Sequence, residues 1–160
     1  MMKHLYLVAV TGIILSGCSD DDDTNYAPEV ISEDFTTTVD TSFSDTLTAS
    51  DANGDTLVYS LDGSPANGSV EVVDNGSFTF TPDAEFTGED SFTFTVSDGV
   101  NDPVSGTIGI IVEAENVMVS TYVRSAFSQP ATGTPLPVNG RVFENDSDDP
   151  AAFDDLLTDY

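Results

Sequence analysis

The stretch that decides the fold is FTGEDSFTFTVSDG, residues 86–99. Within it Phe92, Phe94 and Val96 alternate with threonines, and a glycine follows a polar residue on each side. Alternation at a period of two indicates a β-strand that buries one face and exposes the other, and the flanking glycines are typical of turns. This stretch therefore predicts one strand of a sheet.

The same period continues outward through residues 27–115. FTF at 78–80, LVYSL at 57–61 and IGIIV at 108–112 repeat it, and Asn-Gly or Asp-Gly pairs separate several of the runs. About seven short strands in about 90 residues predict an all-β fold, an immunoglobulin-like antiparallel β-sandwich. The expected strands are 29–39, 44–50, 56–62, 69–73, 77–82, 90–97 and 104–113.

The expected core is unusual for an immunoglobulin-like domain. The chain has one cysteine and no tryptophan, so the customary disulfide and core Trp are both missing. Phenylalanine and aliphatic packing must hold the sandwich together, which is feasible for a domain of this length.

Three segments together resemble the bacterial cadherin-like repeat, also called the tandem-95 or VCBS-type repeat. They are DANGDTL at 51–57, GSFTFTP at 76–82 and the stretch at 86–99, and the resemblance covers roughly 27–115. It implies a non-catalytic binding or adhesion module of a surface protein. Such modules usually occur in tandem, whereas this chain has a single copy.

The first residues predict secretion and anchoring. Lys3 precedes an apolar run, Leu5 to Leu15, which is too short to span a bilayer and is typical of a signal peptide. The Leu15-Ser16-Gly17-Cys18 segment resembles the lipobox of bacterial lipoproteins. The resemblance implies that residues 1–17 are removed and that Cys18 bears the acyl chains, which together anchor stably in a bilayer.

Residues 18–26 then form an acidic tether. Ser19 and the run Asp20 to Asp23 resemble signals of lipoproteins sent to the bacterial outer membrane, on its periplasmic or cell-surface face. The alternative interpretation is a solvated spacer, because a block of like charges stays extended.

Charge excludes several classes of function. The 160 residues contain 29 acids and three Lys or Arg, for a net charge of −26. The single lysine and the single histidine lie within the first four residues. Nucleic-acid binding needs basic phosphate contacts and is excluded, and most nucleophile–base catalysis and zinc sites lack their residues.

Two acidic loops are expected to meet at one end of the sandwich. In an immunoglobulin-type topology the B–C loop, here 51–55, and the F–G loop, here 97–102, lie at the same end, where the first strand also begins. Oxygen donors at alternate positions with a glycine turn suit Ca²⁺, which takes six to eight oxygen ligands. An EF-hand is rejected, because Asp62 stands where its twelfth-position Glu belongs and no flanking helix is expected.

The cadherin-like resemblance carries calcium binding onto candidate residues in these loops. They are Asp51, Asn53, Asp55 and Asp98, with Glu29 and Asp102 at the margin. The competing interpretation is a plain acidic turn, since Asp, Asn and Gly are common turn formers. Either divalent ions neutralise the charge of the sandwich, or a salty medium screens it.

Residues 116–160 have a different composition. Alternation over 117–123 predicts a strand, three prolines within 129–137 predict a loop, and 140–143 predicts a short strand pairing back. Asp149-Pro150 then predicts a helix over 150–158, with Phe153, Leu156 and Leu157 on one face. Such a strand–loop–helix tail either packs on the sandwich or begins a second domain.

The functional hypotheses differ in what binds. The first is a lipid-anchored module that holds a surface protein or polysaccharide, with Ca²⁺ as a candidate cofactor. The second is a spacer that presents residues 116–160. The third is a glycan hydrolase built on paired carboxylates, for which no cleft or aromatic platform is indicated.

Overall fold

The computed structural model describes residues 24–130 and 132–146. Twelve elements follow one another in this part of the chain. The strands are β1 Glu29–Ile31, β2 Glu33–Thr38, β3 Phe43–Thr46, β4 Thr48–Ser50, β5 Val58–Gly63, β6 Gly68–Val72, β7 Ser77–Pro82, β8 Gly88–Ser97, β9 Val104–Glu113, β10 Glu115–Met118 and β11 Arg141–Glu144. The single helix among them, α1, spans Val119–Ser128.

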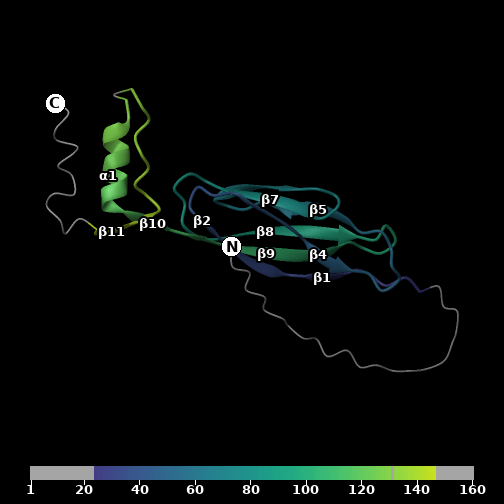
Figure 1. Ribbon diagram of the computed structural model, residues 1–160. Coiled ribbons are helices and arrows are strands. Elements are labelled where there is room, and N and C mark those ends of the chain that lie inside the picture. The colour runs from purple at the N-terminus through teal and green to yellow at the C-terminus, as the bar shows by residue number, and fades with distance from the viewer. Residues whose placement is uncertain (1–23, 131, 147–160) are drawn as a thin grey trace.

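Two sheets face each other and form the expected sandwich (Figure 1). One has the order β2-β9-β8-β5 and the other β3-β7-β6. All pairings within the two sheets are antiparallel except that of β2 with β9, which is parallel. The all-β immunoglobulin-like sandwich predicted from the alternating strands is confirmed.

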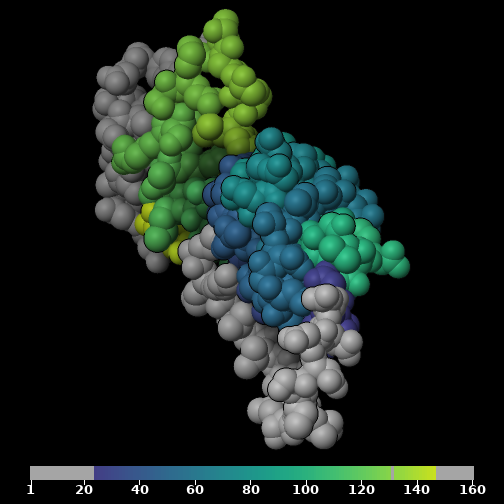
Figure 2. Space-filling view, turned by 90° about the vertical axis from the view of Figure 1, so that its right-hand side faces the viewer, coloured from purple at the N-terminus to yellow at the C-terminus, as the bar shows by residue number. Residues whose placement is uncertain are grey.

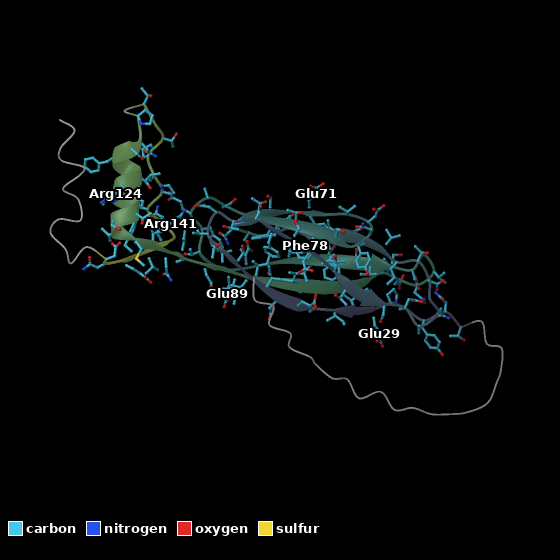
Figure 3. All side chains as sticks on the ribbon, in the orientation of Figure 1. Glu29, Glu71, Phe78, Glu89, Arg124 and Arg141 are labelled. Atoms are coloured by element: carbon cyan, nitrogen blue, oxygen red, sulfur yellow. The ribbon has the colours of Figure 1, made fainter. Side chains whose placement is uncertain are left out.

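The core between the sheets is built on phenylalanine, as expected. Phe78 lies at its centre, with ring centroids 5.7, 5.8 and 5.3 Å from those of Phe35, Phe43 and Phe92 (Figure 3). Phe80 and Phe94 are fully buried beside them. Edge-to-face rings contribute beyond their buried area, so this cluster takes the place of the usual disulfide and Trp.

The first two predicted strands are each divided. The segment expected at 29–39 separates into β1, which pairs with β4, and β2, which pairs with β9. Ser32 lies at the division, and its hydroxyl accepts a hydrogen bond from Thr107 N at 3.1 Å. The segment expected at 44–50 divides at Leu47, whose side chain is buried. At these two divisions the chain changes its pairing partner, so that β2 lies at the edge of one sheet and β3 at the edge of the other.

The strand predicted at 117–123 is wrong. Strand β10 ends at Met118, and α1 begins at the next residue. Contacts made from residues beyond 140 override the local β-propensity: the Asp146 carboxylate accepts from Ser120 N and Oγ, and the Phe143 ring packs edge-on against Tyr122 at 4.9 Å. The crossover through α1 makes β10 and β11 a parallel pair.

Residues 139–141 fasten this C-terminal part to the sandwich. The Arg141 guanidinium contacts Asp40 Oδ2 at 2.9 Å and Glu115 Oε2 at 2.8 Å, while Asn139 Nδ2 donates to Glu85 Oε2 at 2.6 Å. Gly140 has a φ of +69°, and a Cβ there would lie 2.6 Å from Val39 Cγ2, so only glycine fits this approach. Figure 3 places Arg141 between the sandwich and the helix.

Candidate metal centre

The β4–β5 and β8–β9 loops meet at the end of the sandwich where the described chain begins. Figure 1 shows this end opposite α1, and Figure 2 looks onto it, with the purple N-terminal residues beside the green β8–β9 loop. The convergence expected from immunoglobulin topology is present in the structure, as the close approach of Asp51, Asp55 and Asp98 shows.

The β4–β5 loop wraps its backbone around one oxygen of Asp51. Asp51 Oδ1 accepts from Asn53 N at 2.9 Å and from Asp55 N at 3.1 Å, an arrangement typical of an Asx turn. Gly54 continues the turn with a φ of +79°. These backbone donors all bind Oδ1, whereas Asp51 Oδ2 is buried and receives no hydrogen bond.

Asp98 is the buried member of the cluster, with 9% of its surface exposed. Its Oδ1 accepts from Val100 N and Asn101 N, both at 2.9 Å, and its Oδ2 accepts from Asn101 Nδ2 at 2.8 Å. These donors, the Asn101 side chain first, hold the pKa of Asp98 below its usual value. Asp98 is therefore charged at neutral pH.

One carboxylate oxygen from each of Asp51, Asp55 and Asp98 lies within 4.8 Å of the others. Asp51 Oδ2 and Asp55 Oδ2 are buried and have no hydrogen-bond partner. The two basic side chains of the described residues, Arg124 and Arg141, lie at the other end of the molecule (Figure 3). Buried carboxylate oxygens without a donor or counter-charge are costly, so this donor set fits a hard cation.

Residues 24–26 close over the site, which the sequence did not indicate. Asn25 Nδ2 donates to Asp98 Oδ2 at 2.9 Å, and Asn101 Nδ2 lies 3.4 Å from the Asn25 carbonyl oxygen. Asn53 Oδ1 accepts from Tyr26 N at 2.9 Å, and its Nδ2 donates to the Thr24 carbonyl at 3.1 Å. Two asparagines, Asn25 and Asn101, therefore join the site beyond the residues predicted.

The other expected residues take different places. Asn53 binds the N-terminal segment through its side chain, so it supports the site from outside the carboxylate group. The carboxylate group identified among the described residues includes neither Glu29 nor Asp102. Glu29 instead lines a neighbouring hollow of about 340 Å³ together with Tyr26 and Asp51.

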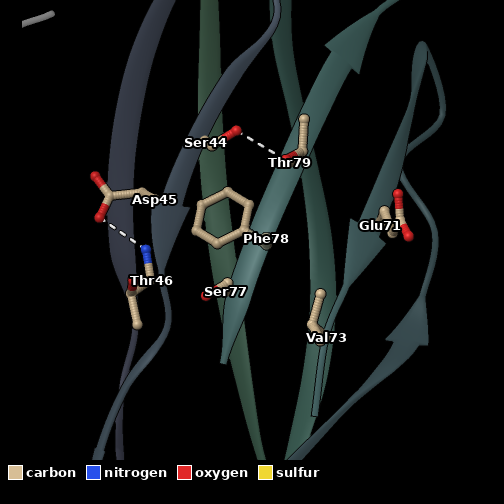
Figure 4. A pocket seen from close by; sticks show the side chains of 8 residues that line it. All are labelled: Ser44, Asp45, Thr46, Glu71, Val73, Ser77, Phe78 and Thr79. Carbon is tan, nitrogen blue, oxygen red and sulfur yellow. Dashed lines mark hydrogen bonds between the residues drawn. The ribbon is translucent and has the colours of Figure 1, made fainter. Parts of the chain in front are cut away.

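A second hollow, of about 420 Å³, lies along β3, β6 and β7 (Figure 4). Its lining is mostly hydroxyl and carboxylate, with Ser44 and Thr79 joined by a 2.7 Å hydrogen bond. None of the eight residues drawn is a histidine, cysteine or lysine. This surface can hydrogen-bond a ligand but holds no nucleophile–base pair.

The expectations for the chain termini lie outside the described residues. These are the signal peptide at 1–17, the lipidated Cys18, the acidic run at 20–23 and the helix at 150–158. No helix within residues 24–130 and 132–146 is both long and apolar enough to cross a membrane.

Comparison with known proteins gives a family match and several partial likenesses. A family model described as a bacterial Ig domain matches residues 25–111. No curated protein matches the chain.

Among solved structures, human protocadherin-24 EC1-2 is 22% identical with a TM-score of 0.45, over 59% of this chain and 52% of that one. The human desmocollin-1 ectodomain is 21% identical with a TM-score of 0.44, over 62% and 24%. An endo-fucoidan hydrolase of glycoside hydrolase family 107 is 25% identical with a TM-score of 0.44, over 57% of this chain and 14% of the hydrolase. The matched region is thus a small part of the hydrolase and about half of the protocadherin fragment.

Proposed function

Because the chain belongs to the bacterial Ig domain family, and so carries a non-catalytic binding or structural module, we propose that it is a Ca²⁺-stabilised adhesion module anchored to the bacterial outer membrane through Cys18. The sandwich is the binding body, the metal centre is at its membrane-proximal end, and the partner is a surface protein or polysaccharide.

The observation that carries the calcium proposal is the pair of buried, unpartnered oxygens on Asp51 and Asp55 beside the charged Asp98. A divalent cation between them would receive one oxygen from each carboxylate. Asn25 could supply a further oxygen if its amide turned to present Oδ1 in place of Nδ2, since the two orientations are nearly isosteric. Ca²⁺ tolerates the irregular geometry of two loops and a terminal segment better than Mg²⁺ does.

Thermal unfolding of the full chain tests the calcium proposal. Extracellular modules bind Ca²⁺ with Kd of about 10⁻⁴–10⁻³ M, so 5 mM Ca²⁺ should stabilise the fold by about 1–2 kcal/mol relative to chelator. Equal Mg²⁺ should give a clearly smaller shift. An unfolding temperature that is the same in calcium and chelator, at constant ionic strength, would remove the metal from the proposal.

The membrane anchor is tested separately. Mass spectrometry of the chain expressed in a lipoprotein-processing bacterium should find an acylated N-terminal Cys18 and no residues 1–17. Cys18→Ser should move the protein from the membrane fraction to the soluble fraction, while the neighbouring Ser16→Ala should leave it in place. An unmodified Cys18 would overturn the proposed anchoring and would leave the calcium proposal unaffected.

A spacer role is the second candidate, and the Arg141 network favours it. Arg141 and Asn139 fasten the C-terminal part to the end of the sandwich opposite the metal centre. A sandwich anchored at Cys18 would thus hold this part away from the membrane. Deleting residues 116–160 should abolish partner binding by a spacer and spare it if the sandwich is the binding body.

A further inference from the structure

The two sheets end on one side of the sandwich in β5 and β6, and this side is open. On the opposite side, the three inward-facing side chains of β2 are all buried. On the β5–β6 side, the inward-facing side chains only partly pack against the core, and Leu61 is 38% exposed. Val58 and Val73 beside them are 48% and 45% exposed. Apolar exposure gathered along one side in this way marks an interaction surface.

Strand β6 also has an unpaired hydrogen-bonding edge on this side. Within residues 24–130 and 132–146 it pairs with β7 alone, and it is the last strand of its sheet. Val73 N donates to Ser77 O at 2.8 Å, and every second residue back along β6 continues this pairing with β7. The N–H and C=O groups of Val70 and Val72 therefore point away from β7, toward the open side.

The sequence of β6 leaves this edge unguarded. Proteins block edge strands against further pairing with lysines, prolines or bulges. The segment GSVEV of β6 contains neither lysine nor proline, and its register with β7 is unbroken over five residue pairs. Its one charged residue is Glu71, which is exposed. The edge can therefore accept another strand, and an acid is the charge that such a strand would meet.

The hollow of about 420 Å³ lies beside this edge, on the outer face of the same sheet (Figure 4). Glu71 lines it at the β6 side and Asp45 at the β3 side. A strand added to β6 would lie about 4.8 Å away and would direct every second side chain to this face. A Lys or Arg at such a position would reach Glu71, with its charged end in the acidic hollow.

Charge and chemistry favour a basic peptide segment over the other occupants. Residues 24–114 carry 17 acids and no Lys or Arg. Two copies joined through their β6 edges would bring both sets of acids together, whereas a basic segment is attracted to them. A polysaccharide has no peptide backbone with which to continue the hydrogen-bond ladder of the sheet.

We propose that the β6 edge binds an extended segment of a partner protein, which adds a strand to the sheet and places a Lys or Arg in the hollow at Glu71. Main-chain hydrogen bonds supply the affinity, and the acidic hollow selects the side chain. This inference rests on the proposed role of the sandwich as the binding body and names the class of its partner. It requires neither calcium nor the membrane anchor.

Amide exchange of the full chain, followed by NMR in chelator, tests this edge with a capped synthetic peptide that alternates valine and lysine. The peptide should slow exchange of the Val70 and Val72 amides by about tenfold or more, because their N–H groups gain acceptors. The amide of Glu71, which already faces β7, should change little. The same peptide with N-methyl groups on its edge-facing amides keeps the charge, cannot continue the ladder, and should give no protection.

Substitutions in the chain separate the ladder from the charge. Val70→Pro removes an outward N–H without breaking a bond to β7, so it should weaken peptide binding by about tenfold or more. Glu71→Lys reverses the charge at the hollow and should weaken binding to a similar degree. Glu89→Lys makes the same charge change at an exposed acid of the other sheet, and at physiological ionic strength it should bind like the unsubstituted chain. Unchanged exchange in β8 and β9 guards against general unfolding.

Several results would overturn the edge as the binding surface. Equal protection by the N-methylated peptide, or equal weakening by Glu89→Lys, would mean that charge alone attracts the probe. A dimer by light scattering that Val70→Pro dissociates would make a second copy the occupant. A chain that keeps its calcium shift and its anchor but does not bind the peptide would refute the edge alone. Peptide binding in chelator would stand even if the calcium proposal failed.

Discussion

Asn25 and Asp98, 73 residues apart in the chain, are joined by a 2.9 Å hydrogen bond from Asn25 Nδ2 to Asp98 Oδ2. The bond ties the segment that enters the sandwich to the loop between its last two strands. Since Asp98 also belongs to the carboxylate cluster, whatever occupies the cluster acts on the entering segment as well. Stability at this end should therefore depend on charge, metal and the first described residues together.

Replacing Asp55 with Asn should have opposite effects with and without calcium. In chelator, the substitution removes one charge from three carboxylates within 4.8 Å and gives the unpartnered Asp51 Oδ2 an amide donor, so the unfolding free energy should rise by about 1 kcal/mol. In 5 mM Ca²⁺, the calcium-dependent gain should largely disappear. Thermal unfolding in the two buffers measures both.

Asp102→Asn is the matched control, because it makes the same charge change at an acid outside the group. It should keep the calcium shift of the unsubstituted chain. A calcium shift that survives Asp55→Asn would place the cation elsewhere.

Replacing Asn25 with Ala should loosen the closure over the site. The variant loses the donor to Asp98 and the oxygen that could serve a cation, so calcium affinity should fall by on the order of tenfold, which is about 1.4 kcal/mol. Calcium titration followed by unfolding temperature gives the affinity. Thr24→Ala is the control, because Asn53 binds Thr24 through its carbonyl oxygen. Equal affinities in the two variants would show that the Asn25 side chain takes no part.

The sequence predicted the sandwich and the meeting of Asp51 with Asp98 for one reason. Alternation fixes which side chains are buried, and strand order then fixes which loops share an end. Neither requires knowledge of a particular contact, so both follow from residues 27–115 alone.

Three features depend on tertiary contacts and could not be predicted in this way. Asn25 joins the site through its side-chain hydrogen bond to Asp98, whereas the sequence predicted only that the first strand begins at this end. Helix α1 forms where β-branched residues favour a strand, because Asp146 and Phe143 contact its first turn. The first predicted strand divides at Ser32, whose hydroxyl accepts a hydrogen bond from the backbone N–H of Thr107, 75 residues further along the chain.

Replacing Phe78 with Ala should cost about 3–5 kcal/mol of unfolding free energy. Its ring lies within 6 Å of three other phenylalanine rings, counted between centroids, and the smaller side chain leaves a cavity that the two sheets cannot close. Denaturant unfolding in calcium measures the loss. Phe127→Ala in α1 removes an exposed ring and should cost under 1 kcal/mol. Similar costs for the two would contradict a core centred on Phe78.

The contribution of Asp98 should depend on pH in a defined direction. Its folded-state pKa lies below the ordinary value of 3.8, so between the two pKa values the unfolded chain binds more protons. The stabilisation is complete above that ordinary value and is lost as pH falls through the folded-state pKa. In chelator, Asp98→Asn should therefore lower the unfolding free energy by its full amount at pH 6–7, and by progressively less as pH falls below about 4. Denaturant unfolding of both chains across this range is the measurement, and a difference that grows toward low pH would refute the sign.

Replacing Arg141 with Met should release residues 115–146 from the sandwich while leaving the sandwich folded. The guanidinium, whose side chain is 10% exposed, bridges Asp40 and Glu115, and neither acid has another cation among the described ion pairs. The backbone N–H of Glu85 and then Arg141 lower the pKa of Asp40, so that carboxylate stays charged when the arginine is lost. Only the pair with Asp40 joins this part to the sandwich, and Asp40 is partly exposed, so the docking should weaken by about 1–2 kcal/mol, less than for a fully buried pair. Amide exchange in β10 and β11 should accelerate about tenfold or more, while β8 and β9 keep their rates.

Arg124→Met makes the same charge change within α1 and should leave β10 and β11 protected. Arg141→Lys keeps the charge but cannot donate to both acids with one planar fork, so its exchange rates should fall between those of the other two chains. Rates in Arg141→Lys equal to those of the unsubstituted chain would mean that charge alone, and not the two-sided bridge, holds residues 115–146 in place.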